Sequence, residues 1–290
     1  MKRTIRAASL LAAVAAFAGP ASAATVPGWY SSTDLSFGMQ RGNSKTLNAG
    51  INANLTRQWL RTAWRTNGSF VRNDVSEPSR IAVGSTTNFV TDFGPTVTKS
   101  EKIFANSDLE RRLTERFFWN VAGSFERDQF AGLDSRVLGA LGVGYLWQKP
   151  DSSGLFRTGI AGTYTSQSET VEDPTTEDTF AGVRFTADGE KRFGDRLQNT
   201  FTSNLIVDEN VQDTDDLRFN WQNSLAVAMS QRLALKMGVQ LAYDNQPQLV
   251  EFDLLLPNVV QPVKVSAPAE KLDLGVTVSL VINFQPGQGR

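Results

Sequence analysis

The chain has 290 residues, with 29 basic and 30 acidic side chains, no histidine and no cysteine. The near-neutral balance argues against a nucleic-acid-binding protein, which needs a basic surface to contact phosphate. The absence of histidine and cysteine removes the usual general base, the usual zinc ligands and any disulfide, so we expect a protein that is not an enzyme and has no metal or other cofactor.

The first 23 residues have the pattern of a secretory signal peptide. A basic segment contains Lys2, Arg3 and Arg6, and the apolar run of residues 7–18 follows it. Ala21-Ser22-Ala23 then supplies a small-residue cleavage site. The apolar run is shorter than the roughly 20 residues that a membrane-spanning helix needs, so an uncleaved anchor is disfavoured. We therefore expect residues 1–23 to be removed and residues 24–290 to form an exported protein.

The exported part alternates between apolar and polar residues over segments of about ten residues, the length of a tilted membrane strand. The first clear case has Leu47, Ala49, Ile51, Ala53 and Leu55 on one parity and mainly Asn, Thr and Gly on the other. The same pattern recurs in residues 117–126, 137–147, 197–207, 217–229, 233–243 and 272–284. Asn, Gln, Ser, Thr and Gly dominate the polar parity, which suits the wet interior of an outer-membrane barrel.

The connections between these segments predict the topology. Short turns are expected at residues 57–61, 113–116, 148–154, 193–196 and 230–232, and longer segments at 73–102, 128–135, 168–178, 209–214 and 244–270. The two kinds alternate if residues 41–44 form a tight outer turn. This pattern predicts an all-β, antiparallel, up-and-down transmembrane β-barrel of about 12 strands with both termini in the periplasm. Thr86–Thr98 also alternates, and we interpret it as a hairpin arm within the long outer loop 73–102, because a further spanning strand would break the parity.

Aromatic residues support this orientation. With the predicted topology, ten of them fall near the periplasmic strand ends: Trp29, Tyr30, Trp64, Phe117, Trp119, Tyr145, Trp147, Phe156, Phe193 and Phe284. Such a girdle is typical of amphipathic rings at a membrane interface.

One segment resembles a known family. Glu126, Arg127, Asp128, Phe130, Ala131, Gly132, Asp134 and Arg136 are similar to the E-R-D-x-F-A-G-x-D-x-R segment of the DUF481 outer-membrane proteins, which include the salt-induced outer membrane proteins. Arg41-Gly42-Asn43-Ser44 and Leu113-Thr114-Glu115-Arg116 are weaker matches, and the resemblance extends over residues 29–284. It implies an outer-membrane barrel and no particular mechanism, since the family is named for a domain of unknown function. One departure is the tail of residues 285–290 after Phe284, because such barrels commonly finish on an aromatic residue.

The charges of this motif have two interpretations. They lie on both arms of one hairpin and predict a cross-strand ion-pair network that holds the outer loop, at about 0.2–1 kcal/mol for each exposed pair. The alternative is that the arginines contact a ligand or lipopolysaccharide. The acidic segments 169–178 and 208–216 similarly could hold a divalent cation, but they lack the ligand spacing of a calcium loop, so solvated outer loops are the preferred interpretation.

The inward parity also carries charges: Asp34, Arg65, Arg157, Arg184, Arg218 and Lys236. In a lumen such side chains either pair and brace the wall or line a channel and set its ion preference. Basic residues outnumber acidic ones in this set, which would favour a mild preference for anions.

The sequence therefore predicts a non-enzymatic outer-membrane barrel that acts as a narrow passive pore or envelope component. Its expected partners are outer-membrane lipid, lipopolysaccharide and, during biogenesis, the barrel-assembly machinery, with no nucleic acid. The alternative is a structural or adhesive surface protein that binds a partner through its outer loops. Residues 252–256 of loop 244–270 suggest an exposed apolar contact patch for that role.

Overall fold

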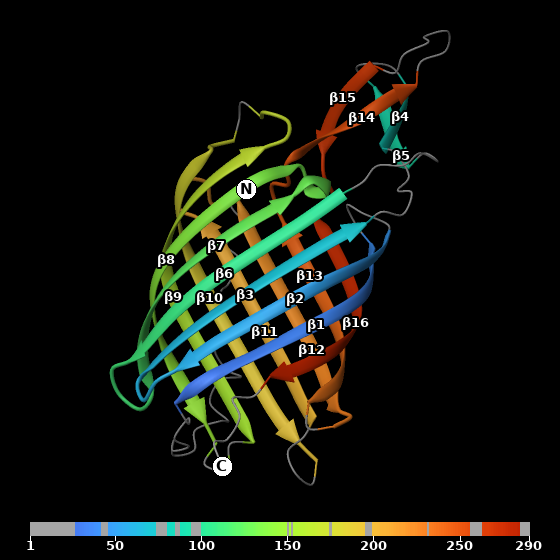
Figure 1. The fold of residues 1–290 in the computed structure, drawn as a ribbon. Helices are drawn as coiled ribbons and strands as arrows, with labels where there is room; N and C mark the ends of the chain where they lie inside the picture. The colour runs from blue at the N-terminus through green and yellow to red at the C-terminus, as the bar shows by residue number, and fades with distance from the viewer. Residues whose placement is uncertain are drawn as a thin grey trace, which may run out of the picture.

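A computed structural model describes residues 27–41, 46–73, 80–84, 88–93, 100–149, 151, 153–173, 176–194, 199–230, 232–255 and 263–284. The predicted signal peptide and the tail after Phe284 lie outside these residues. Within them, twelve strands form a closed antiparallel barrel, and four short strands form a separate sheet beyond one end (Figure 1). The prediction of a barrel of about 12 strands is confirmed.

The wall runs in the order β1-β16-β13-β12-β11-β10-β9-β8-β7-β6-β3-β2 before it closes. Its strands are β1 (Gly28–Arg41), β2 (Thr46–Gln58), β3 (Thr62–Asn73), β6 (Ser100–Arg112), β7 (Phe117–Asp128), β8 (Leu133–Gln148), β9 (Gly154–Glu169), β10 (Thr179–Phe193), β11 (Asn199–Asn210), β12 (Leu217–Ala228), β13 (Leu233–Asp244) and β16 (Leu272–Phe284). Neighbours in the chain are neighbours in the wall, except where the short strands intervene. Closure between β1 and β16 leaves no unpaired edge, as a membrane-spanning sheet requires.

The side-chain parity is continuous around the barrel. Phe37 on β1, which is 68% exposed, pairs by register with Val278 on β16, whereas the adjacent Ser36 is buried. Leu141 and Tyr164 are similarly exposed on β8 and β9. Apolar side chains thus cover the outer face and polar ones turn inward, because successive residues of a strand point to opposite faces. An apolar outer face of this kind belongs to a barrel embedded in membrane lipid. No helix among the described residues is long and apolar enough to cross a membrane.

Tight turns join the strands at one end, which we call the turn rim. These turns follow β2, β6, β8, β10 and β12. The first of them is typical, since β3 begins only four residues after β2 ends. In the turn after β8, the Asp151 carboxylate accepts hydrogen bonds from the Ser153 amide and hydroxyl (3.0 and 2.7 Å), and these bonds lower its pKa. The first residue of β1 and the last residue of β16 also lie at this rim.

Aromatic rings follow the turn rim on the outer face. Trp29 and Trp64 meet edge to face with centroids 6.1 Å apart, and the rings of Tyr145 and Trp147 are 4.5 Å apart. Trp147 in turn contacts Phe156 at 5.5 Å. The Arg57 guanidinium lies 5.2 Å from the Trp29 ring centre. These contacts form two aromatic groups at the turn rim, one on β1 and β3 and the other on β8 and β9.

The opposite end, the loop rim, carries the additional sheet. Its strands are β4 (Arg80–Gly84), β5 (Phe89–Phe93), β14 (Leu249–Leu255) and β15 (Val263–Pro268), in the order β15-β14-β4-β5. β14 pairs in parallel with β4, so two loops far apart in sequence build one sheet (Figure 1). The described part of Thr86–Thr98 belongs to β5 of this sheet and does not cross the wall, as the loop parity predicted.

The sheet has its own small core, which corrects one prediction. Phe252 and Leu254 were expected to form an exposed patch, but they are 9% and 0% exposed and pack with Ala82, Val250 and Ala269. They are buried because β4, which is distant in sequence, pairs with β14 and brings Ala82 into the same apolar cluster. The remaining residue of that prediction beyond β14, Leu256, lies outside the described residues.

Candidate functional site

The barrel interior is the candidate site, and the six charges predicted for the inward parity lie there. Each is on the parity opposite to the exposed apolar side chains, and each has an oppositely charged partner: Asp34 with Lys236, Arg65 with Asp108 and Glu110, Arg157 with Glu110, Arg184 with Asp208, and Arg218 with Asp216. All six of the predicted inward charges therefore belong to ion pairs.

Two of these pairs connect strands that are not neighbours. Lys236 Nζ on β13 lies 3.0 Å from Asp34 Oδ2 on β1, across the intervening β16. Arg157 Nη2 on β9 lies 3.3 Å from Glu110 Oε2 on β6, across β7 and β8. Long side chains can span the intervening strands because the inner face of the wall is concave and inward residues between them, such as Gly142, are small.

Glu110 is the centre of the denser of these clusters. Its side chain is only 3% exposed, and its carboxylate also meets Arg65 Nη1 at 3.1 Å and Arg112 Nε at 3.9 Å. Asp108 accepts from Arg65 at 3.1 Å and from the Asn120 amide at 2.8 Å. A buried carboxylate among three guanidinium groups is stabilised by these partners, whose positive charge it neutralises in turn. The cluster fills one side of the barrel near the turn rim.

Apolar residues complete that side. The Arg157 guanidinium lies 5.5 Å from the centre of the Phe118 ring. Phe118 and Leu146 point into the lumen, where most side chains are polar, and both are buried there. The Phe118 ring lies over Gly144 on the neighbouring strand, its partner by register. This half of the turn mouth is packed with side chains.

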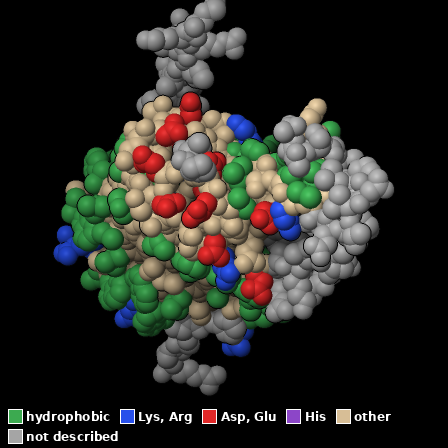
Figure 2. Space-filling model, turned by 90° about the horizontal axis from the view of Figure 1, so that it is seen from above, with side chains coloured by type: hydrophobic (Ala, Val, Ile, Leu, Met, Phe, Trp, Pro, Cys, Tyr) green, Lys and Arg blue, Asp and Glu red, His purple; other side chains and the backbone are tan. Residues whose placement is uncertain are grey.

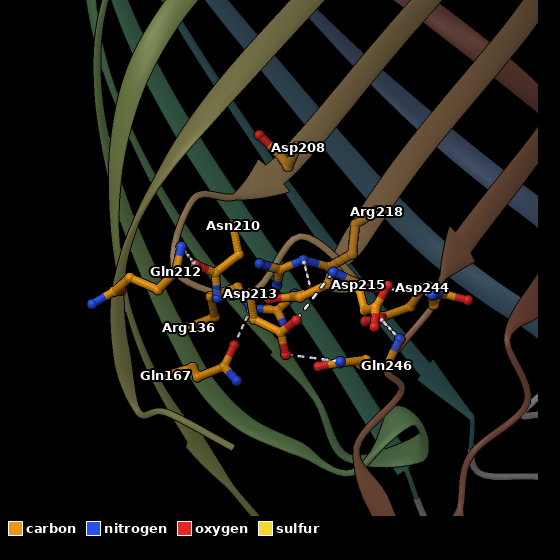
Figure 3. A network of polar contacts seen from close by, with 12 residues as sticks. Arg136, Gln167, Asp208, Asn210, Gln212, Asp213, Asp215, Arg218, Asp244 and Gln246 are labelled. Carbon is orange, nitrogen blue, oxygen red and sulfur yellow. Dashed lines mark hydrogen bonds and ion pairs between the residues drawn. The ribbon is translucent and has the colours of Figure 1, made fainter. Parts of the chain in front are cut away.

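A second polar network lies at the loop rim (Figure 3). Arg184 makes two hydrogen bonds to the Asp208 carboxylate, at 2.7 and 2.8 Å. Arg218 lies 3.3 Å from Asp216 and 5.1 Å from the centre of the Phe180 ring. Gln246 donates a hydrogen bond to Asp213 at 2.9 Å and so links the loop after β13 to the loop after β11. The network ties the loops to one another over the mouth.

Seen from the loop rim, acidic side chains gather over the middle of this face and apolar ones surround it (Figure 2). A small cavity of about 220 Å³ lies here, lined by Glu169, Glu177, Asp213, Asp216, Arg218 and several amides. Among the described residues, no group of three or more acidic side chains is arranged to hold a metal ion. The acidic segments 169–178 and 208–216 thus contribute a negatively charged mouth.

Sequence reasoning missed several inward charges. Inward positions also hold Lys102, Asp108, Glu110, Arg112, Glu126, Asp128, Arg136, Glu169, Asp188, Glu190, Arg192, Asp244 and Asp273. Acidic residues are at least as frequent as basic ones once these are included, so the excess of basic residues that suggested an anion preference does not hold. The inward charges of β6 were missed because charged or polar residues such as Glu101, Ser107 and Arg111 occupy its outward parity as well, which weakens the alternation.

The motif hairpin forms the cross-strand network expected of it. Glu126 lies between Lys102 (3.7 Å) and Arg136 (3.8 Å), and Asp128 contacts Lys102 at 2.6 Å. Asp128 Oδ1 also accepts from the Ala131 amide at 3.2 Å, at the end of the short helix η3 (Gln129–Ala131). Arg127 and Asp134 face outward and lie 3.4 Å apart. The side chain of Phe130 lies outside the described residues.

The backbone conformation and the close contacts at position 132 of the motif require a glycine. Its φ of 78° lies in the left-handed region, and a Cβ at this position would lie 2.6 Å from the Leu249 carbonyl oxygen. The hairpin therefore packs directly against the start of β14, and the family motif anchors the outer sheet to the barrel wall.

Replacing Gly132 by valine is expected to release this contact. A β-branched residue is strained at positive φ, by about 1–2 kcal/mol, and would also clash with Leu249. Limited proteolysis of the refolded protein should then cleave between β13 and β16 faster than in the wild type, while the barrel keeps its heat-modifiable gel mobility. Gly139→Ala is the matched control, because a Cβ there meets nothing within 4 Å. Equal cleavage rates for both variants would contradict the anchoring role.

Comparison with known proteins agrees with this architecture. The family model described as "Protein of unknown function, DUF481" matches residues 33–256, which includes the motif hairpin and most of the wall. The chain belongs to the DUF481 family. A search of curated proteins gave no match.

Solved structures that resemble this DUF481 protein include outer-membrane porins. The NanC porin superimposes with a TM-score of 0.51 at 6% sequence identity, and the match covers 87% of this chain and 100% of that one. The KdgM porin in complex with disordered oligogalacturonate matches with a TM-score of 0.43 at 7% identity over 88% and 99% of the two chains. An anion-selective porin from Comamonas acidovorans has a TM-score of 0.38 at 7% identity over 89% and 99%. The first likeness establishes a shared porin-like fold of the outer membrane.

Proposed function

We propose that this DUF481 protein is a non-enzymatic, narrow passive pore of the outer membrane, with the turn rim and both termini in the periplasm. The observation that carries the proposal is a closed barrel with polar residues on its inner face and a cavity of about 750 Å³ at the turn rim. Twelve strands enclose a narrower lumen than the roughly 16–18 strands of wide aqueous channels. The lack of histidine and cysteine supports a protein without nucleophilic or acid–base chemistry.

The orientation rests on the loops. In bacterial barrels short turns lie on the periplasmic side and longer loops face outward. Here the turn rim has the short connections and the loop rim carries the additional sheet. In this orientation, cleavage of the signal peptide proposed for residues 1–23 would leave the new N-terminus at the periplasmic rim. The outer sheet would stand among lipopolysaccharide, and the barrel-assembly machinery would insert the wall.

Planar-bilayer recording of refolded residues 24–290 in symmetric KCl tests the pore. We expect single-channel steps smaller than those of a porin with 16–18 strands, because the Glu110 cluster and Phe118 fill part of the cross-section. A silent membrane, under conditions in which the inserted protein shows the heat-modifiable mobility of a folded barrel, would overturn the proposal.

A second candidate function is an adhesive surface protein, and the outer sheet is the observation that favours it. The sheet has a buried core of its own and extends beyond the loop rim, so it could present a surface to a partner. Replacing Val250–Val265 by a short Gly-Ser linker should abolish binding of whole cells to a surface if this candidate is correct, with conductance retained. Unchanged surface binding would count against it.

A further inference from the structure

The cavity at the turn rim has a lining that differs from the other half of the same mouth. Its volume is about 750 Å³, within the range of roughly 300–1,000 Å³ typical of small-molecule pockets. It is lined from β1, β2, β10, β11, β12, β13 and β16, which are the strands opposite the packed Phe118 side. The turn mouth is therefore half packed and half hollow.

Hydroxyl and amide groups make up most of the polar lining. They belong to Ser32, Asn54, Thr200, Thr202, Ser224, Ser230 and Asn283. Asn54 donates to the Ser32 hydroxyl at 3.3 Å, and the Thr202 and Ser224 hydroxyls are 2.7 Å apart. Each hydroxyl can donate one hydrogen bond and accept two, so these groups retain capacity for a solute.

The charged residues of the lining, Asp34, Glu190 and Lys236, each have an oppositely charged partner, although the partner of Glu190 does not itself line the cavity. Lys236 is paired with Asp34 at 3.0 Å, and Glu190 is paired with Arg192 at 2.7 Å. The Asp34 side chain is only 4% exposed, and its Oδ1 atom has no hydrogen-bond partner among the described residues. Lys236 is 36% exposed and has three donors, of which Asp34 takes one. The pair holds an ammonium group at the cavity wall and is neutral as a whole.

We propose that this cavity is a binding subsite for an uncharged, polyhydroxylated solute about the size of a disaccharide. Neighbouring hydroxyls on such a solute match the alternating donors and acceptors of Thr202, Ser224 and Asn54. A net anion or cation gains little from a lining whose charges are already paired, and it would lose its hydration on entry. The inference rests on the proposed pore function, because it names the class of solute that binds inside the pore.

Saturation-transfer NMR on the refolded protein in nanodiscs tests the subsite without requiring conduction. We expect transfer to sucrose, but little transfer to gluconate or to glycine betaine at the same concentration. Thr202→Val removes a lining hydroxyl at nearly constant volume and should weaken sucrose binding roughly fivefold, the loss typical of one hydrogen bond. Asp34→Asn with Lys236→Gln tests the pair without leaving a buried charge and should also weaken it.

Thr277→Val is the matched control, because Thr277 points inward from β16 but does not line the cavity. Unaltered sucrose transfer in that variant, together with loss in Thr202→Val, would support the subsite. Equal transfer to all three solutes, or equal effects of the two valine variants, would overturn it. A protein that conducts KCl but shows no sucrose transfer retains the pore function and loses the subsite, and a silent protein that binds sucrose does the reverse.

Discussion

Replacing Glu110 by glutamine is expected to lower the free energy of unfolding of the barrel by about 3 kcal/mol, the cost typical of removing one partner from a buried ion pair. Glu110 is the only acidic residue found in contact with Arg157 within the described structure, and it also meets Arg65 and Arg112. Its neutral replacement leaves a buried guanidinium without compensation. Urea unfolding in lipid vesicles, followed by tryptophan fluorescence, measures the change.

Two variants separate this effect from a general effect of charge. Glu190→Gln removes a carboxylate from an exposed pair at the same rim, where a loss of less than about 1 kcal/mol is expected. Glu110→Gln combined with Arg157→Met removes both charges and should recover much of the stability, since replacing a buried pair by apolar groups is often nearly neutral. If Glu110→Gln and Glu190→Gln cost the same, the cluster does not brace the wall.

Gly144→Ala is expected to be the other strongly destabilising substitution. A Cβ at Gly144 would lie 2.2 Å from Cζ of Phe118 and 2.5 Å from the carbonyl oxygen of Thr158. The ring could rotate away, but the carbonyl belongs to the adjacent strand and cannot move without disturbing the sheet. We expect a loss of about 3 kcal/mol, at the upper end of overpacking effects, measured in the same unfolding assay.

Gly162→Ala provides the control, because a Cβ there meets nothing within 4 Å. Gly162 faces lipid, where an added methyl group is harmless or slightly favourable. Combining Gly144→Ala with Phe118→Leu should recover only part of the loss, since the clash with Thr158 remains. Full recovery would show that the ring alone, and not the spacing of β8 and β9, requires glycine at this position.

Several features of the fold could be predicted because they depend on local pattern. Alternation in segments such as Thr46–Thr56 fixes which side chains face lipid, since successive residues of a strand always face opposite ways. Turn residues such as Leu113–Arg116 fix where strands end, and both properties together determine the count of twelve. The inward placement of Asp34, Arg65 and Lys236 follows from the same parity.

The partners of those inward charges could not be predicted in this way. Lys236 meets Asp34 only because the barrel closes between β1 and β16, and Arg157 meets Glu110 because the wall curves between β9 and β6. The sequence also suggested an exposed patch at Phe252, because no local signal shows that β4 would pair with β14 and complete an apolar cluster there.

The sequence by itself thus determined the class of fold, the number of wall strands and the inward or outward direction of most side chains, because the two-residue period of a strand is a local property. The tertiary structure decided which half of the turn mouth is packed around Phe118 and Glu110 and which half is hollow. It also decided that two distant loops share one sheet. These features depend on contacts between residues tens to hundreds of positions apart, which the closed wall brings together and no local pattern records.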